Sequence, residues 1–273
     1  MEIGVLRQMM KRAKVWAIVA EDVKRDREDK GVVGRVLSEE HKRLLFETAA
    51  SREPWLVAYC AAVLAVSTTC RGVELKHLRW SEVDLFERII QIRRSKTAAG
   101  HRGIPLNSDA LAALARLRAR AEALGSSDPN HFVFPACEKQ RIDPERPQKS
   151  WRSAWRSLVN ESARRAGKAA ETGAAARGQN VEEASKRAAE VFINQKGQRL
   201  RFHDLRHQAI TELAEAGASD ATLMAVAGHL SREMMEHYSH ARMAAKRSAL
   251  DRLAGGLITP PTEEFKVVSE GVN

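Results

Sequence analysis

The sequence is poor in cysteine and in aromatic residues, and it contains no long apolar run. Its three cysteines, Cys60, Cys70 and Cys137, are too widely spaced for a CxxC metal clip, and their odd number argues against a disulfide framework. No apolar stretch reaches the roughly 20 residues that span a bilayer, and the N-terminus lacks the pattern of a signal peptide. We therefore expect a protein of the reducing cytoplasm, neither secreted nor embedded in a membrane.

Basic residues, in contrast, are abundant. The 273 residues include 45 Lys and Arg against 35 Asp and Glu, which gives a formal net charge of +10. Such an excess favours a polyanionic partner, most simply nucleic acid. A basic protein without any special partner would have the same balance, so the charge does not decide the function by itself. The chain is long enough for one catalytic domain with appendages.

The apolar pattern predicts a mainly helical α+β fold with one small antiparallel sheet. Residues 83–106 hold β-branched runs separated around Glu87-Arg88 and around "KTAAG", which predicts a three-stranded meander with Lys96 at a hairpin tip. Helical periodicity and end signals predict helices over residues 3–17, from Ser38 onward, over 55–69, and over 110–125, where Gly125 ends the helix.

Residues 161–190 differ in composition from the rest of the chain. They are rich in Ala, Arg and Glu and have almost no large apolar side chain, so we expect a solvated helix or a mobile insertion rather than a core element. After them, "FHDLRHQAITELAEAG" and "DATLMAVAG" predict two short helices that each end at a glycine, and Ser231 is expected to cap a third.

The stretch "RFHDLRH", residues 201–207, admits two kinds of site. His203 and His207 are four apart, as in the zinc-binding HExxH helix, but the acid after the first histidine is the shorter Asp204 and Arg206 would place a positive charge near the ion. His203 and Arg206 are three apart and lie on one helix face, where the arginine fork suits a phosphate. Taken alone, the stretch is also compatible with an ordinary capped helix.

Further residues in the chain favour the phosphate, and their order resembles that of the tyrosine recombinases or phage integrases. Members of that family use an arginine, a hairpin lysine, a His-x-x-Arg pair, a His or Trp, and a tyrosine nucleophile. The resemblance spans roughly residues 38–253, interrupted at 161–190, and rests on "CRGVELKHLRWSEVD", "RRSKTAAGHRGIPL", "FHDLRH", "AGH" and "MMEHYSHA". The matching residues are, in turn, Arg71, Lys96, His203, Arg206, His229 and Tyr238.

The resemblance implies a transesterification on DNA that requires neither a metal ion nor any other cofactor, ATP included. Tyr238 would attack the phosphodiester to give a 3′-phosphotyrosyl bond and a free 5′-hydroxyl. Arg71 and Arg206 would stabilise the charge of the transition state. Lys96 is the expected general acid and His203 the expected general base.

Other side chains receive smaller roles. His229 is the expected hydrogen-bond donor to the phosphate, and Glu74 and Asp84 are candidates for acids that brace Arg71. Three more histidines have no place in the family motif and are expected to be structural or solvent-exposed: His207, His237 and His240. The resemblance also implies double-stranded DNA as partner, a homo-tetramer on that DNA, and a DNA-associated location in the cytoplasm of a bacterial or phage-encoded system.

The short N-terminal region departs from the family pattern. Only about 37 residues precede Ser38, where family members carry a helical core-binding domain. We expect residues 1–37 to be the last helix and linker of such a domain, 38–253 the catalytic domain with its insertion at 161–190, and 254–273 a C-terminal tail.

Several alternatives remain open at the level of sequence. The chain could be a catalytically silent DNA-binding relative or a truncated fragment, or a type IB topoisomerase that shares the tyrosine chemistry. It could also be a regulator that uses "ITELAEAGASDATLMAVAGHL" as a helix-turn-helix. A zinc hydrolase is the weakest alternative.

Overall fold

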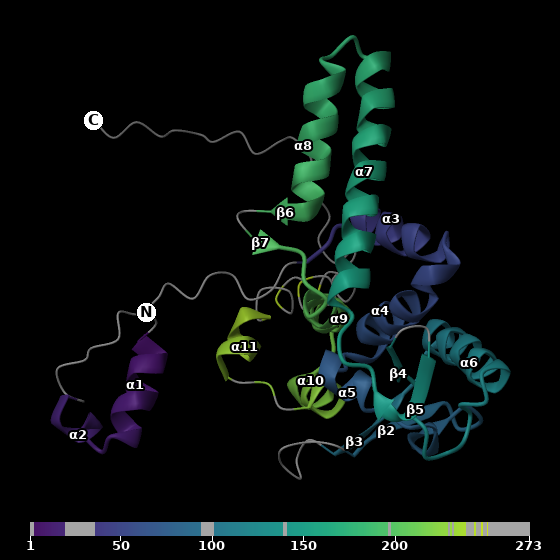
Figure 1. The fold of residues 1–273 in the computed structure, drawn as a ribbon. Helices are drawn as coiled ribbons and strands as arrows, with labels where there is room; N and C mark the ends of the chain where they lie inside the picture. The colour runs from purple at the N-terminus through teal and green to yellow at the C-terminus, as the bar shows by residue number, and fades with distance from the viewer. Residues whose placement is uncertain are drawn as a thin grey trace, which may run out of the picture. The chain divides into compact units, whose positions relative to one another are not determined.

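The computed structural model describes residues 3–19, 36–93, 101–138, 141–195, 198–228, 230 and 232–238, together with 243, 247 and 250 (Figure 1). It divides into two units, residues 1–33 and 34–273. The first unit holds α1 (Ile3–Arg12) and α2 (Trp16–Val19). The single helix predicted over 3–17 is wrong in extent, because Lys14 adopts a left-handed φ of 58°, which interrupts the helical hydrogen-bond ladder.

The second unit is built around a buried helix, α4 (Leu56–Thr68), as the sequence predicts. The helices α3 (Glu39–Ala50), α6 (Ser108–Ala123) and α9 (Asp204–Glu215) pack against it. The predicted helix ends are confirmed, since Ser38 accepts the backbone N–H of His41 at 3.2 Å and Gly125 follows α6 with a φ of +65°.

The predicted three-stranded meander is confirmed. It consists of β1 (Val83–Asp84), β2 (Ile89–Ile92) and β3 (Arg102–Pro105) in the antiparallel order β1-β2-β3. Ile90 faces Ile104 in the register, and both are buried, so one face of the sheet packs on the core. Ile92 pairs with Arg102 at one end of the β2–β3 ladder. Lys96 lies outside the described residues.

Shorter elements connect these parts and join the site to the sheet. They are the 3-10 helices η1 (Glu53–Trp55) and η2 (Trp80–Glu82), α5 (Gly72–Lys76), the two-stranded sheet of β4 (Pro135–Glu138) with β5 (Arg141–Pro147), and that of β6 (Asn194–Gln195) with β7 (Gln198–Arg199). The described chain is thus mainly helical with small antiparallel sheets, which is the predicted fold class.

The segment 161–190 belongs to a helical hairpin, which corrects the expectation that it contributes nothing to the core. It consists of α7 (Arg152–Ala176) and α8 (Val181–Ile193), which lie antiparallel and extend together away from α9 (Figure 1). Ala163 is only 2% exposed and belongs to the main core cluster. Small side chains also let α7 and α8 approach each other closely, as at Gly167 and Ser185.

The C-terminal helices follow the prediction as far as they are described. α9 is followed by Gly217 with φ +87°, and α10 (Asp220–Ala227) ends at Gly228 with φ +74°. α11 (Arg232–His237) is the start of the third predicted helix, whose cap Ser231 lies outside the described residues. Within the described part of the chain, no helix is long and apolar enough to cross a membrane.

Candidate active site

Arg71 stands at the junction between the buried helix α4 and the short helix α5. Thr69, the C-cap of α4, has a left-handed φ of 55°, and this turns the chain so that Arg71 becomes the N-cap of α5. The Arg71 side chain keeps 33% of its surface exposed, while its Nη1 donates to Glu74 Oε1 at 3.0 Å. Arg71 is therefore oriented by a carboxylate while a third of its side chain stays exposed.

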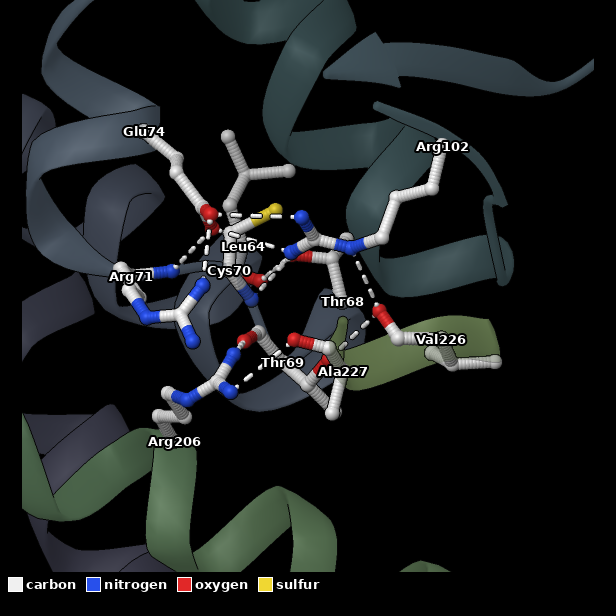
Figure 2. Close-up of polar contacts among 10 residues, drawn as sticks. All are labelled: Leu64, Thr68, Thr69, Cys70, Arg71, Glu74, Arg102, Arg206, Val226 and Ala227. Atoms are coloured by element: carbon white, nitrogen blue, oxygen red, sulfur yellow. Dashed lines mark hydrogen bonds and ion pairs between the residues drawn. The ribbon is translucent and has the colours of Figure 1, made fainter. Parts of the chain in front are cut away.

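Glu74 binds two arginines at once. Its carboxylate accepts the Arg71 backbone N–H at 2.7 Å, and it accepts Nη1 and Nη2 of Arg102 at 3.2 and 2.9 Å (Figure 2). Burial opposes ionisation of Glu74, but the hydrogen bonds from Arg102 and Arg71 and their charges outweigh it, so its pKa lies below the usual value. The other candidate acid, Asp84, is exposed and accepts the backbone N–H groups of residues 86 and 87 in the β1–β2 turn.

Arg206 is held by backbone carbonyls and is 2% exposed. Its Nη1 donates to the carbonyl of Thr69 and its Nη2 to that of Ala227 at 2.9 Å, so the guanidinium ties the end of α4 to the end of α10 (Figure 2). Burial and the nearby charge of Arg71 lower its pKa to about 10, which leaves it cationic at neutral pH.

The cluster contains three guanidinium groups and a single carboxylate. Arg71, Arg102 and Arg206 contribute three positive charges and Glu74 one negative charge, which leaves a net charge of +2 on these four side chains. Such an excess in a partly buried site attracts an anion, and a phosphate with several free oxygens matches the arginine donors.

His203 lies at the N-cap position of α9, one turn before Arg206 on the same helix. The residue is exposed, yet partial burial of its imidazole and the charge of Arg206 lower its pKa below the usual value. The next residue, Asp204, is buried and accepts Arg201 Nη2 at 2.8 Å and the Arg201 backbone N–H at 2.7 Å. These bonds fix the entry into α9.

Tyr238 is bound to a histidine that the sequence motif left without a role. The phenol Oη and His207 Nδ1 are 2.8 Å apart, and the residues are 2% and 5% exposed. Burial raises the pKa of Tyr238 to about 12, although Arg206 opposes the shift, and burial together with His203 lowers the pKa of His207 to about 4. Both side chains are therefore neutral at pH 7.

The structure describes four of the six predicted site residues. Arg71 and Arg206 lie together around the charged cluster, His203 lies on the same helix as Arg206, and Tyr238 is held by His207 on that helix. Lys96 and His229 lie outside the described residues. In the described ranges, no group of three or more His, Cys, Asp or Glu side chains is arranged to hold a metal ion.

Sequence reasoning missed two residues, Arg102 and His207. His207 is four residues after His203 and adjacent to Arg206, so its position on α9 was a usable signal. Arg102 begins a strand whose alternate residue Ile104 is buried, and a charged residue at that register was the corresponding signal.

A cavity of about 670 Å³ opens beside Arg71 and His203. Trp151 and Phe202 form part of its wall, with ring centroids 4.7 Å apart. The remaining basic side chains that line it are Lys76, Arg152, Arg156, Arg199 and Arg201. The candidate site is thus continuous with a positively charged, partly aromatic hollow.

This fold is that of tyrosine recombinase catalytic domains. The fold matches the transposon Tn1549 integrase solved with circular intermediate DNA, at 20% identity and a TM-score of 0.57, over 91% of this chain and 78% of that chain. It also matches XerA recombinase, at 17% identity and a TM-score of 0.51, over 93% and 76%. The chain belongs to the phage integrase family, whose sequence model matches residues 35–245.

A curated relative gives a similar result at the level of sequence. The shufflon-specific DNA recombinase of Escherichia coli is 25% identical over 258 residues, which cover 92% of this chain and 53% of the relative. The chain thus spans about half the length of that relative.

Proposed function

We propose that this chain carries the strand-cleaving and strand-joining chemistry of a site-specific DNA recombinase, with Tyr238 as nucleophile. The observation that carries the proposal is the arrangement on α9. This helix holds His203 and Arg206 at the charged cluster with Arg71, and one residue further it holds His207 against Tyr238.

Arg206 and Arg71 would contribute differently to stabilising the transition state. Arg206 is fixed by the carbonyls of Thr69 and Ala227, so it is preorganised before any ligand arrives. Arg71 is partly exposed and can donate to the non-bridging oxygens of a phosphodiester. Together they would stabilise the negative charge that grows on the phosphorus oxygens in the transition state.

Tyr238 would form the covalent intermediate. Its oxygen attacks the phosphorus, the bond to the deoxyribose 5′-oxygen breaks, and the product is a 3′-phosphotyrosyl bond with a free 5′-hydroxyl. The reverse attack by another 5′-hydroxyl restores the DNA, so the bond energy is conserved without ATP. Because Tyr238 is 2% exposed and bonded to His207, we infer that it leaves this position when DNA binds.

Proton transfers complete the proposed mechanism. Tyr238 is protonated at pH 7, since its pKa is raised to about 12, and His203 is the proposed base that removes the proton as attack proceeds. Lys96 is the proposed acid that protonates the leaving oxygen, and His229 the proposed donor to the phosphate. The last two assignments rest on the family resemblance.

The proposed partner is double-stranded DNA, bound through its phosphates. The basic side chains around the 670 Å³ cavity continue the positive field from Arg71, and such contacts supply most of the sequence-independent affinity. Tetramer formation on two duplexes is proposed from the family resemblance.

The test is a covalent trap. A pool of duplexes with randomised sequence around a nick is incubated with the protein in EDTA and separated on a denaturing gel, because the short strand released by cleavage diffuses away and preserves the adduct. We expect a protein–DNA band that disappears in Tyr238→Phe, while DNA binding measured by fluorescence anisotropy stays within about threefold, since the substitution removes a single hydroxyl.

Each other outcome points to a different function. Persistence of the band in Tyr238→Phe would refute the assignment of the nucleophile. DNA binding without any band would favour the catalytically silent relative. Relaxation of supercoiled plasmids irrespective of their sequence would favour the topoisomerase.

A further inference from the structure

We propose that Arg102 is a positioning residue for the reaction, which acts by locking Glu74 so that Glu74 holds Arg71 in the orientation that meets the phosphate. The inference rests on the proposed function, because it assigns a role in the same site. Arg102 lies in the stretch "RRSKTAAGHRGIPL" that carries the family resemblance, but it is not among the six predicted site residues.

Arg102 clamps Glu74 and the end of α10 among the described residues. Its Nη1 and Nη2 donate to the two carboxylate oxygens of Glu74 at 3.2 and 2.9 Å, and its Nε donates to the Val226 carbonyl at 2.9 Å (Figure 2). The two side chains are 6% and 5% exposed. A buried pair of this kind holds a single geometry, because each charge removed from its partner would remain uncompensated.

Glu74 transmits this geometry to Arg71. A carboxylate offers about four acceptor positions, and here two are occupied by Arg102 and two by the backbone N–H and Nη1 of Arg71. Without Arg102 the carboxylate is free to rotate toward Arg71 and draw the guanidinium inward. The exposed third of the Arg71 side chain would then no longer point to the ligand.

The surrounding backbone is shaped for an arginine. Gly228 has a φ of +74°, and a Cβ at that position would lie 3.2 Å from Arg102 Nη1 and 3.3 Å from its Cζ. The planar guanidinium therefore lies against a residue without a side chain. Lysine cannot replace it, since a single ammonium group does not bind both Glu74 oxygens and the Val226 carbonyl with the same geometry.

The clamp also joins segments far apart in sequence. Arg102 begins β3, Glu74 lies on α5, and Val226 is in the last turn of α10. One side chain thus fixes β3, which follows Lys96 in the sequence, to the end of α10, which precedes His229. This explains why a buried charge is placed at the end of an otherwise apolar sheet face.

The first experiment is a double-mutant cycle between Arg102 and Arg71, read as the single-turnover rate of adduct formation at saturating DNA. Arg102→Met should lower the rate about 100-fold, because Arg71 would no longer be preorganised to stabilise the charge of the transition state. If Arg102 acts through Arg71, the variant carrying both Arg102→Met and Arg71→Ala should be no slower than Arg71→Ala alone. The matched control is Arg43→Met, on an arginine that is 72% exposed, and it should cleave at the wild-type rate.

A modified substrate separates positioning from a general loss of structure. A neutral methylphosphonate at the scissile position removes the charge that Arg71 neutralises, so the penalty of Arg102→Met should shrink to within about tenfold. A penalty that multiplies with that of Arg71→Ala, or that is equal on both substrates, would overturn the inference, as would a rate within threefold of wild type.

Two further measurements keep the inference testable if Arg102→Met does not fold or if no DNA is cleaved. Arg102→Lys retains the charge and should fold, with the same loss of rate. The NMR signal of the Arg71 Nε–H, assigned by its absence in Arg71→Lys, should shift or broaden in Arg102→Lys. An unchanged signal overturns the positioning role, whereas absence of any adduct from the wild-type protein counts against the proposed function only.

Discussion

At the scale of residues, the candidate site combines arginines held by a carboxylate and by backbone carbonyls with a tyrosine, the proposed nucleophile, held by a histidine. His207 contacts Tyr238, and in the folded protein its pKa is lowered from 6.5 to about 4, chiefly by burial. Facing groups include His203, Asp204 and Arg206 on the same helix and Arg201 just before it. The free energy of unfolding should therefore depend on pH in part through His207.

The direction of this pH dependence follows from the number of protons that the folded and unfolded chains bind. The pKa of His207 is about 4 when folded and 6.5 when unfolded, so between these values the unfolded chain binds more protons and stability falls as pH falls. Lowering the pH from 7.5 to 5 should reduce the free energy of unfolding by about 2 kcal/mol through this residue. Urea unfolding at both values measures the loss.

The control is His207→Gln, which keeps a hydrogen-bonding group but does not titrate. Between pH 7.5 and 5, this variant should lose about 2 kcal/mol less stability than the wild-type protein, because it lacks the titration of His207. Glu74 and the other acids titrate equally in both proteins. Equal losses in the two proteins would mean that His207 is not buried as a neutral group.

At the scale of elements, the α7–α8 hairpin depends on close approach of the helices at one glycine. A Cβ at Gly167 would lie 2.9 Å from Ser185 Oγ and 3.2 Å from the Ser185 carbonyl oxygen, whereas at Gly173 it would meet only the flexible end of Arg177, at 3.4 Å. The same substitution should consequently have opposite effects at the two positions of one helix.

Gly173→Ala should stabilise the protein by about 0.5–1 kcal/mol, because alanine is the better helix former. Gly167→Ala should destabilise it by about 1 kcal/mol, since the contact with Ser185 outweighs the gain in propensity. Thermal unfolding of the two variants against wild type measures both. Stabilisation by Gly167→Ala would show that the hairpin adjusts at no cost and that the helix contact is loose.

At the scale of the whole molecule, the net charge of +10 and the basic cavity predict binding to DNA that weakens steeply with salt. The slope of log K against log salt is about −0.9 per phosphate neutralised. Arg152→Gln and Arg156→Gln should each make this slope shallower by about one unit, on any DNA sequence. Fluorescence anisotropy titrations over a salt series test this, and Arg43→Gln, on α3 and mostly exposed, should leave the slope unchanged.

The sequence by itself determined the local structure and the family. The buried helix α4, the meander and the glycine-ended helices α6, α9 and α10 follow from patterns within a few residues, where apolar periodicity and capping act. The His-x-x-Arg pair is of the same kind, because three residues on one helix share a face. The weaker prediction for 161–190 arose because small residues carry no apolar signal, although they pack closely at Gly167.

Only the tertiary structure decided which side chains meet across the core. Glu74 and Arg102 are 28 residues apart, and His207 and Tyr238 are 31 apart, so no local pattern could pair them. Packing brings these partners together: Leu75 beside Glu74 and Ile104 of β3 belong to the main core cluster, whereas Tyr238 is buried in a second cluster with Ile210 of α9. Physical contact, burial and the resulting pKa values are properties of that packing, whereas the candidate reactive groups were predicted from their order along the chain.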